Sequence, residues 1–476
     1  MNRWLTLFVF LVSSIASAAG TFKAGAATSN ITPDIGADII GGFLPFPAKH
    51  VHDELHARCL VLDDGKTKIA LVVCDLLGMH RSVSVEARKL IQEAIGIPME
   101  NVLISGTHTH SAASALGDNR YTSEQTLNDY QRFVARRIAD GVHRANNLLR
   151  PAEIAFGTAE APEHVFNRRW FMKEGTVPVN PFGKIDKVKM NPPGGSKDLT
   201  EPAGPTDPTV SFIALREPGG RLISVFSAYS LHYVGGVGDG HISADYYGMY
   251  CEALKKLQQG AENDPPFVAL MANGTSGDIN NINFVTPRKG SPPYEHMREV
   301  AEDVAKKVNE ALGKLTWKPS ADLSARYREA QISWRPLEAD LISWAKEKQD
   351  NAPRIQGKAD LPTIYAGRVL RLSQAVNPAL IPLQLLRVGD IGIGTFPCET
   401  FAEIGLEFKK RSPITHSFMV ELSHGYYGYL PTPRHFALGG YETWPGTNYL
   451  EPQASVKMLD QLVEMAGEVS TVNTAN

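Results

Sequence analysis

Apolar residues along the chain fall into two patterns, short continuous runs and runs spaced three and four residues apart. The continuous runs predict strands at 56–63, 67–75, 101–106, 209–216, 221–232, 266–272, 382–396 and 416–422. The spaced runs predict helices at about 82–96, 122–149, 244–259, 292–314 and 453–468. Strand and helix signals therefore alternate, which favours an α/β fold with β-sheets flanked by helices.

Two segments depart from this alternation. Residues 170–208 are rich in Pro and Gly and show little periodicity, so we expect a long loop. Its charged residues, Lys184, Asp186, Lys187 and Lys189, predict a polar pocket rim without a continuous apolar trough. Residues 316–380 are charged and contain Trp, and they predict a helical excursion from the sheet.

The first residues have the composition of a secretory signal peptide. Arg3 is followed by the apolar run "WLTLFVFLV" and by Ala16-Ser17-Ala18, an A-x-A cleavage site. We therefore predict a signal peptide at 1–18 and a single domain at 19–476, exported to a periplasm or secreted. No later apolar run approaches the ~20 residues of a transmembrane helix, so no transmembrane segment is expected.

Composition narrows the possible functions. Of 476 residues, 43% are hydrophobic and 21% charged, and the formal net charge is −3 with no basic block. Nucleic acid binding, which needs a clustered positive surface, is not expected. The four cysteines lie far apart in apolar contexts without a C-x-x-C spacing. Free buried thiols are favoured over disulfides, although export would permit disulfides.

Polar residues that could carry chemistry follow predicted apolar strands at four places. In "NVLISGTHTHS", His108 and His110 are two residues apart, so both rings can face the same side of an extended chain. The other places are His232 after "LISVFSAYSL", Glu399 in "GIGTFPCETF", and the turn "VELSHGYYGYLPT" with His424, Tyr426, Tyr427 and Tyr429. Two imidazoles and a carboxylate from separate strand ends suit catalytic zinc with an open position.

Each of these residues also has an ordinary structural explanation. His108 and His110 could fill space where a strand meets a loop, and His232 could be a hydrogen-bonded core residue. Glu399 could be a carboxylate at a helix N-terminus, and the tyrosines could serve packing alone. Spacing by itself leaves these alternatives open.

Several segments occur in an order that resembles a known family. They are "LHARCLVLDDG", "VVCDLLG", "NVLISGTHTHS", "FNRR", "FSAYSLHYVG", "HISADYYG", "ANGTSGDINN", "FPCETFAEIG" and "YYGYLPT…GGYE". Together they resemble the catalytic domain of the neutral, non-lysosomal ceramidases over about residues 21–470. The resemblance implies a ceramidase-like α/β domain with mixed sheets and one Zn²⁺ per chain.

The resemblance also implies roles for particular residues. The expected zinc ligands are His108, His232, Glu399 and Tyr429, with Tyr426 as a competing register for the last. His110 is expected near the scissile group, and Arg168 and Tyr441 on the substrate side. Because the free ring N–H of a metal-binding His usually meets a carboxylate or carbonyl, Asp245 and Asp278 are predicted to support the ligands.

The sequence departs from the family at three points. The family's G-D-V-S-P-N is "GDINNIN" here, so Asn280 replaces a Ser that has been assigned a catalytic role. Its N-R-S-P becomes Asn167-Arg168-Arg169-Trp170, which changes the pocket wall. We also expect no C-terminal immunoglobulin-like domain. These departures predict the family's metal chemistry on a different substrate.

Three hypotheses follow. The first is a zinc-dependent hydrolase that cleaves an N-acyl (amide) bond of a lipid or polar molecule by metal-activated water. In that scheme Arg168 and Tyr429 stabilise the oxyanion and His110 transfers a proton. The second hypothesis keeps the zinc but changes the bond to an ester or glycosidic linkage, with a glycan as a rival substrate to a lipid. The third is a non-catalytic exported binding protein of the same fold.

Overall fold

The structure, a computed structural model, describes residues 22–42, 44–259, 264–351 and 359–471. Its centre is built from three β-sheets that face one another. The first sheet has the order β7-β6-β5-β1-β8. Its strands are β1 (Lys23–Asn30), β5 (His56–Asp63), β6 (Lys68–Cys74), β7 (Val102–Gly106) and β8 (Arg150–Pro151). The predicted signal peptide at 1–18 lies outside the described residues.

The other two sheets have four strands each, in the orders β17-β15-β14-β9 and β19-β20-β21-β23. The second contains β9 (Glu153–Glu160), β14 (Thr209–Arg216), β15 (Leu222–Tyr229) and β17 (Val268–Asn273). The third contains β19 (Leu323–Ile332), β20 (Ala379–Val388), β21 (Ile391–Thr395) and β23 (His416–Val420). In each sheet one pair runs parallel, namely β6–β7, β15–β17 and β21–β23, while the other pairs are antiparallel. The prediction of mixed sheets flanked by helices is confirmed.

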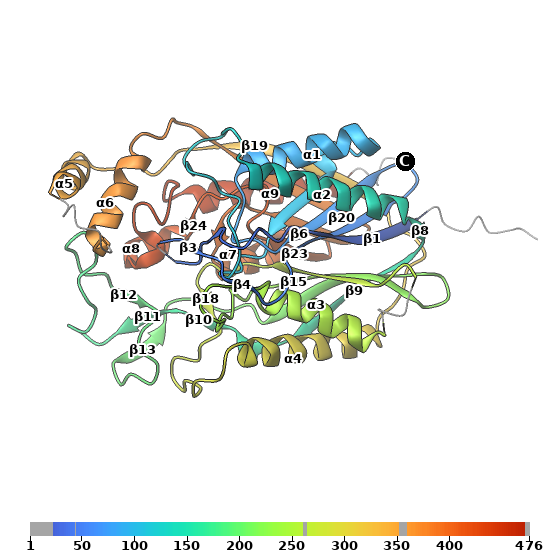
Figure 1. Cartoon of the computed structure of the whole chain (residues 1–476), viewed down its shortest axis with the longest axis horizontal. Helices are drawn as coiled ribbons and strands as arrows, with labels where there is room; N and C mark the ends of the chain where they lie inside the picture. Colours follow the sequence, from blue (N-terminus) through green and yellow to red (C-terminus); the bar gives the residue numbers. More distant parts are fainter. Residues whose placement is uncertain (1–21, 43, 260–263, 352–358, 472–476) are drawn as a thin grey trace, which may run out of the picture.

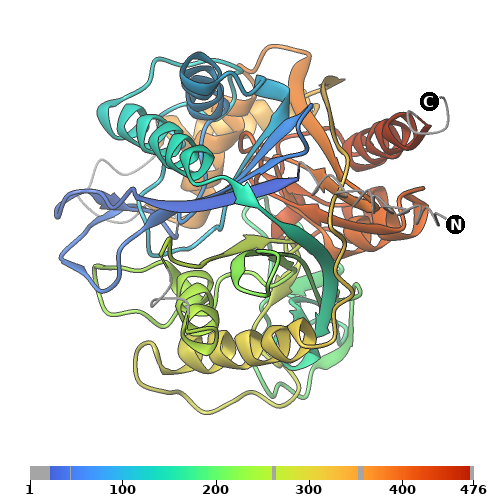
Figure 2. The same cartoon turned by 90° about the vertical axis from the view of Figure 1, so that its right-hand side faces the viewer.

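The inner faces of the three sheets share one apolar core, to which Leu71, Phe226 and Ile393 each contribute from a different sheet. Helices cover the outer faces, because each presents an apolar stripe to the sheet beneath it. Figures 1 and 2 show these helices on three different sides of the molecule. They are α1 (Arg81–Ile95) and α2 (Asp129–Asn147) on the first sheet, α3 (Asp245–Leu257) and α4 (Glu295–Leu312) on the second, and α7 (Ala402–Arg411) and α9 (Ala454–Thr471) on the third.

Two segments differ from the expectations. Residues 316–380 hold the ten-residue strand β19 before the helices α5 (Ala339–Asp350) and α6 (Leu361–Leu372). The predicted helical excursion is present as α5 and α6, but the strand before them was not predicted. The expected loop 170–208 carries most of a three-stranded sheet of order β12-β11-β13. Its strands are β11 (Arg169–Met172), β12 (Val188–Met190) and β13 (Leu199–Pro202).

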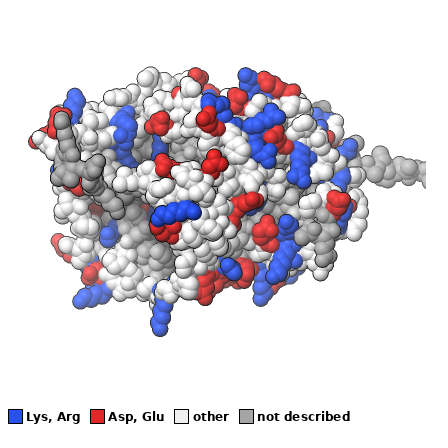
Figure 3. All heavy atoms as spheres, in the orientation of Figure 1, with Lys and Arg blue, Asp and Glu red and all other residues white. Residues whose placement is uncertain are grey.

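The cysteines and the surface charges are arranged as the amino-acid composition predicts. All four cysteines are buried and free, as predicted. Acidic and basic side chains are interspersed on the face shown in Figure 3. In the part of the chain that the structure describes, no helix is both long and apolar enough to cross a membrane.

Candidate metal centre

The three side chains that most clearly predicted a metal site each follow a strand of a different sheet. His108 comes after β7, His232 comes after β15, and Glu399 begins the short strand β22 (Glu399–Thr400) just beyond β21. All three are at most 3% exposed. His108 has a left-handed backbone with a φ of 70°, which is uncommon for a non-glycine residue and is shared by His424.

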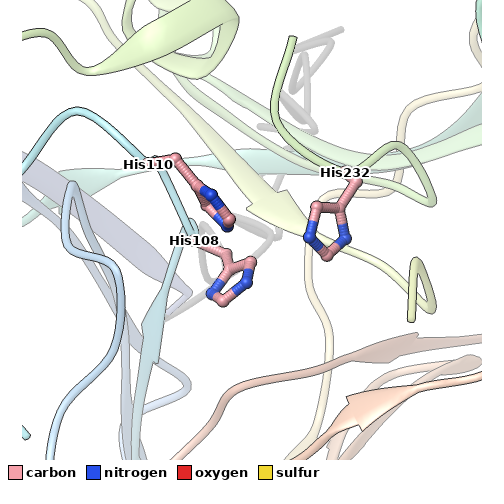
Figure 4. Close-up of side chains that lie close together, drawn as sticks. All are labelled: His108, His110 and His232. Atoms are coloured by element: carbon pink, nitrogen blue, oxygen red, sulfur yellow. The ribbon is translucent and has the colours of Figure 1, made fainter. Parts of the chain in front are cut away.

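The three strand ends bring these side chains together. Oε2 of Glu399 lies 3.2 Å from Nε2 of His108 and 3.7 Å from Nε2 of His232. His110 joins them, since one ring nitrogen from each of the three histidines lies within 4.8 Å of the others. Figure 4 shows the three imidazole rings turned toward one another. The site therefore places three imidazoles and a carboxylate around one point.

Hydrogen bonds on the far side of two rings fix their orientation. Nδ1 of His108 lies 2.7 Å from the carbonyl oxygen of Leu77, and Nδ1 of His232 lies 3.2 Å from both the carbonyl and hydroxyl oxygens of Ser276. The Ser276 hydroxyl in turn donates to Oε1 of Glu421 at 2.7 Å. Because a carbonyl oxygen only accepts, each Nδ1 carries a proton and each Nε2 keeps a free lone pair.

The protonation states match those of metal ligands. Burial lowers the pKa values of His110 and His232 well below 6.5, so both rings are neutral at pH 7. Burial would raise the pKa of Glu399, but His108 and His232 when protonated, together with the Tyr426 hydroxyl, lower this pKa by more than burial raises it, so the carboxylate is ionised at pH 7. His108 also contacts this carboxylate.

The same groups leave hydrogen-bonding capacity unused. Nε2 of His110, Nε2 of His232 and Oε2 of Glu399 have no hydrogen-bond partner among the described residues. Buried polar atoms are nearly always paired, so three such atoms facing one point require an explanation. Two neutral imidazoles and a carboxylate are a donor set that zinc binds, and the residues present therefore fit a zinc ion.

Two tyrosines approach the carboxylate from the turn after β23. Strand β24 (Tyr429–Leu430) runs parallel to β22 and places Tyr429 directly beside Glu399. The Tyr426 hydroxyl donates to Oε1 of Glu399 at 2.6 Å, and the Tyr429 hydroxyl interacts with Glu399 and Arg168. Since both phenols reach the same carboxylate, Tyr429 as the fourth ligand stays a prediction.

Arg168 lies on the other side of these tyrosines. It follows β10 (Phe166–Asn167), and its guanidinium carbon lies 5.3 Å from the centre of the Tyr429 ring. Nε of Arg168 donates to Glu442 at 2.8 Å, while its Nη2 is buried without a partner among the described residues. Tyr441 packs edge-on to Tyr429 with ring centres 5.7 Å apart. Both predicted substrate-side residues thus line the same cavity as the histidines.

The predicted supporting roles of Asp245 and Asp278 are wrong. Asp245 accepts hydrogen bonds from the backbone amides of Val234 and Gly235. Asp278 accepts from the Ala402 amide and from the side chain of Asn167. Neither carboxylate is hydrogen-bonded to an imidazole of the site, because backbone amides and an Asn already occupy their oxygens.

The supporting groups are instead Leu77 and the Ser276–Glu421 pair, which the sequence reasoning missed. A backbone carbonyl such as that of Leu77 leaves no sequence signal. Glu421 does leave one, because it is an acidic residue inside the apolar run "FMVELSH". A second carboxylate was also missed: Glu442 pairs with Arg168 and, through its other oxygen, with Arg169.

A cavity of about 390 Å³ opens onto the four metal-site side chains. The segment 170–208 lines it with Asp186 and Lys189 of the predicted polar rim and also with apolar groups. The apolar contributors are Val177, Pro178, Val179, Val188 and Met190. Asn280, the residue in place of the family Ser, lies outside the lining and donates from its side chain to Asn191 at 3.0 Å.

A mixed α/β fold of three helix-covered sheets, with a buried imidazole–carboxylate site at the strand ends, defines the class of this protein. The family described as neutral/alkaline non-lysosomal ceramidase, N-terminal, matches residues 22–291. That match spans more than half of the chain, and the chain belongs to this family.

Individual relatives are more distant. Neutral ceramidases B and A of Dictyostelium discoideum are 24% and 22% identical over 254 residues, which is 51% of this chain and 33% of each relative. The match thus spans about a third of these relatives. A solved structure described as ceramidase complexed with C2 has a TM-score of 0.68 at 16% identity, covering 95% of this chain and 75% of that one. The structure of neutral ceramidase from Pseudomonas aeruginosa has a TM-score of 0.65 at 17% identity, covering 94% of this chain and 74% of that one. These two structures share the fold.

Proposed function

We propose that this protein is a zinc-dependent hydrolase that cleaves an N-acyl (amide) bond after export of the mature chain. The observation that carries the proposal is the set of three unpaired buried atoms on His110, His232 and Glu399 at one end of the cavity. In the proposed arrangement His108, His232 and Glu399 hold one zinc ion, with Tyr429 as the fourth ligand. Family membership supports amide hydrolysis as the reaction.

The reaction adds water across the amide and yields a carboxylic acid and an amine. A zinc ion held by these residues would supply Lewis acidity, which would lower the pKa of water at the site from ~15.7 towards ~7. His110 is neutral at pH 7 and has a free Nε2, so it accepts the proton that water loses on attack. The same nitrogen then returns this proton to the leaving amine.

Two further side chains stabilise the negative charge that develops on the carbonyl oxygen. Nη2 of Arg168 is a buried donor without a partner among the described residues, and the hydrogen bond from its Nε to Glu442 holds the guanidinium in place. Burial raises the pKa of Tyr441 to about 12, so its hydroxyl stays protonated and can donate. Ser at position 280 is not needed for this scheme.

The test begins with the metal content of the purified mature protein and its His232→Ala variant. About one zinc per chain is expected in the wild type and its loss in the variant. The exposed His143 on α2 supplies a matched control, His143→Ala, that should keep the metal. A wild type that stays metal-free after zinc is offered would contradict the proposal.

A panel of N-acyl amides, esters and glycosides then identifies the bond. Hydrolysis of amides by the zinc-loaded protein, and its loss in His110→Ala with the metal retained, supports the proposed reaction. Hydrolysis of esters or glycosides alone would show that the same metal site cleaves an ester or glycosidic bond and not an amide bond. Zinc binding without turnover of any member of the panel would favour a binding protein.

A further inference from the structure

The charged groups that line the cavity are unequal in number. Four are basic, namely Arg120, Arg168, Arg368 and Lys189, and two are acidic, namely Asp186 and Glu399. Both carboxylates are already engaged. Glu399 faces the histidines, and Asp186 accepts hydrogen bonds from the side chains of Trp444 at 2.8 Å and Asn180 at 3.2 Å. Arg168 is balanced by its ion pair with Glu442, which leaves Arg120, Arg368 and Lys189 beside two acids in the lining, so the cavity carries an excess of positive charge.

Arg120 is the clearest source of this excess. Its guanidinium carbon lies 5.8 Å from the centre of the Tyr426 ring, and the group donates a hydrogen bond to the Tyr449 hydroxyl. Its surroundings are tyrosines, and among the described residues it forms no ion pair with a carboxylate. Arg58 and Arg168, by contrast, pair with Asp75 and Glu442. Buried Arg88 also has no carboxylate partner, but two backbone carbonyls accept hydrogen bonds from it.

A second guanidinium lies at the same end of the cavity. Arg368 projects from α6, and its guanidinium carbon lies 5.1 Å from the centre of the Tyr365 ring. The backbone at Gly446 packs against its stem so closely that a Cβ there would lie 2.5 Å from Cβ of Arg368. Arg120 and Arg368 also share a neighbour in the cavity lining, because both interact electrostatically with Tyr449.

We propose that the cavity binds an acylated substrate carrying an anionic group, a carboxylate or a phosphate, which Arg120 and Arg368 recognise. This inference rests on the proposed amide hydrolysis and names its substrate class. The planar guanidinium fork matches both anions, and a cation in a partly buried cavity is stabilised by a bound anion. An uncharged N-acyl lipid would leave the charge of Arg120 without a partner.

The position of Arg120 also limits where the anion lies on the substrate. The Tyr426 ring contacts Arg120 on one side, and its hydroxyl donates to Glu399 on the other. The anion is therefore only a few bonds from the amide, as in an N-acyl amino acid or an N-acyl amine that carries a phosphate. Hydrolysis of the former consumes one water and releases a carboxylic acid and the free amino acid.

The test compares four short substrates with the zinc-loaded protein. They are N-hexanoylglycine, its uncharged analogue N-hexanoylglycinamide, N-hexanoylethanolamine, and the O-phosphate of N-hexanoylethanolamine. For at least one anion, kcat/KM should exceed that of its neutral partner by about tenfold or more, as charged hydrogen bonds imply. Preference for the first or the last compound tells whether carboxylate or phosphate is the natural group.

Variants assign the preference to its residues. Arg120→Gln should reduce the anion-to-neutral ratio of kcat/KM by about tenfold, and Arg120→Lys should retain part of it. Arg371→Gln is the matched control, since Arg371 is exposed on the same helix as Arg368 and lies outside the cavity lining. Its ratio should stay within about twofold of wild type. A ratio near one in the wild type, or one that Arg120→Gln does not change, overturns the inference.

A binding measurement separates this inference from the proposed reaction. Calorimetry with N-hexanoylglycine and the phosphate compound on the His232→Ala protein needs no turnover. The zinc-loaded wild type could hydrolyse no amide while anions still bind and Arg120→Gln weakens that binding. This result would support the anion site and contradict the proposed reaction. Hydrolysis of neutral amides without anion binding would support the proposed reaction and contradict the anion site.

Discussion

Two buried histidines of this protein differ in one respect that burial does not reveal. His232 and His424 are at most 1% exposed, and burial lowers the pKa of each well below 6.5. The ring nitrogens of His424 lie 3.1 Å from the Ser84 hydroxyl and 2.9 Å from Oε1 of Gln384, so both are satisfied. Nε2 of His232 has no partner among the described residues. Hydrogen-bond satisfaction, and not burial, distinguishes the two.

The difference has an energetic meaning. An unpaired buried donor or acceptor costs about 1–3 kcal/mol, so a fold tolerates few of them. The metal-site histidines and Glu399 concentrate three such atoms in one place. A bound cation would offset this cost, whereas the His424 environment has no cost to offset.

The largest expected effect is on metal binding and activity. His232→Gln should remove the zinc and lower kcat/KM by about a thousandfold, because several kcal/mol of transition-state stabilisation depends on the metal. His424→Gln should keep the metal content of the wild type. Metal analysis and amide hydrolysis of the two purified variants measure this. Equal loss of zinc in both would show that the contrast is wrong.

For the stability of the metal-free protein, substitution of His424 should have a larger effect than substitution of His232. His424→Ala leaves Ser84 and Gln384 unpaired and opens a cavity, so the free energy of unfolding should fall by about 2–4 kcal/mol. His232→Ala removes an atom that was already unpaired and should cost less. Urea unfolding of the metal-free proteins gives both values. A larger loss of unfolding free energy for His232→Ala than for His424→Ala would contradict the conclusion that Nε2 of His232 is unpaired in the metal-free protein.

A smaller effect is expected from the residues behind each ring. The Ser276 hydroxyl contacts Nδ1 of His232 and donates a hydrogen bond to Glu421. Ser276→Ala should therefore weaken zinc binding by about 10–100-fold. Ser84→Ala is the matched exchange beside His424 and should leave zinc affinity unchanged. Competition with a chelator of known affinity measures both. Equal affinities in the two variants would mean that Ser276 does not orient the ligand.

The comparison also explains how far the sequence could predict this site. Apolar runs located the strands before His108, His232 and Glu399, so the candidate ligands were recognisable. Their convergence depends on the packing of three sheets, which no local pattern encodes. Asp245 and Asp278 looked equally available, yet the backbone already occupies their oxygens.

For the fold, apolar residues spaced three and four apart predicted most of the helices that cover the outer sheet faces, but not α7 (Ala402–Arg411). The alternating, half-buried strand β19 was missed because its charged residues resemble a helical surface. His424 was grouped with the tyrosines of its turn. Only the positions of Ser84 and Gln384, distant in sequence, show that its ring belongs to the core.

The smallest expected effect is a pH dependence of stability that His424 should carry. Above pH 6.5 its ring is neutral in both the folded and the unfolded chain, and it adds no pH dependence. As the pH falls through 6.5, the unfolded chain binds a proton that the buried ring, close to Arg88 and Arg81, does not accept. The free energy of unfolding therefore decreases, by up to about 1.4 kcal/mol per pH unit for one proton.

His424→Gln should make this decrease shallower by up to one proton, and the same exchange at the exposed His143 controls for the loss of any histidine. Urea unfolding of the metal-free proteins between pH 7 and about 5 supplies the slopes. His232 should contribute a slope of the same sign in the metal-free protein, because burial also lowers its pKa. Zinc binds only the unprotonated ring, so it should keep folded His232 unprotonated to lower pH and extend its contribution there, while that of His424 stays unchanged. A slope at His424 that responds to zinc would join the two histidines into one site and remove the contrast between them.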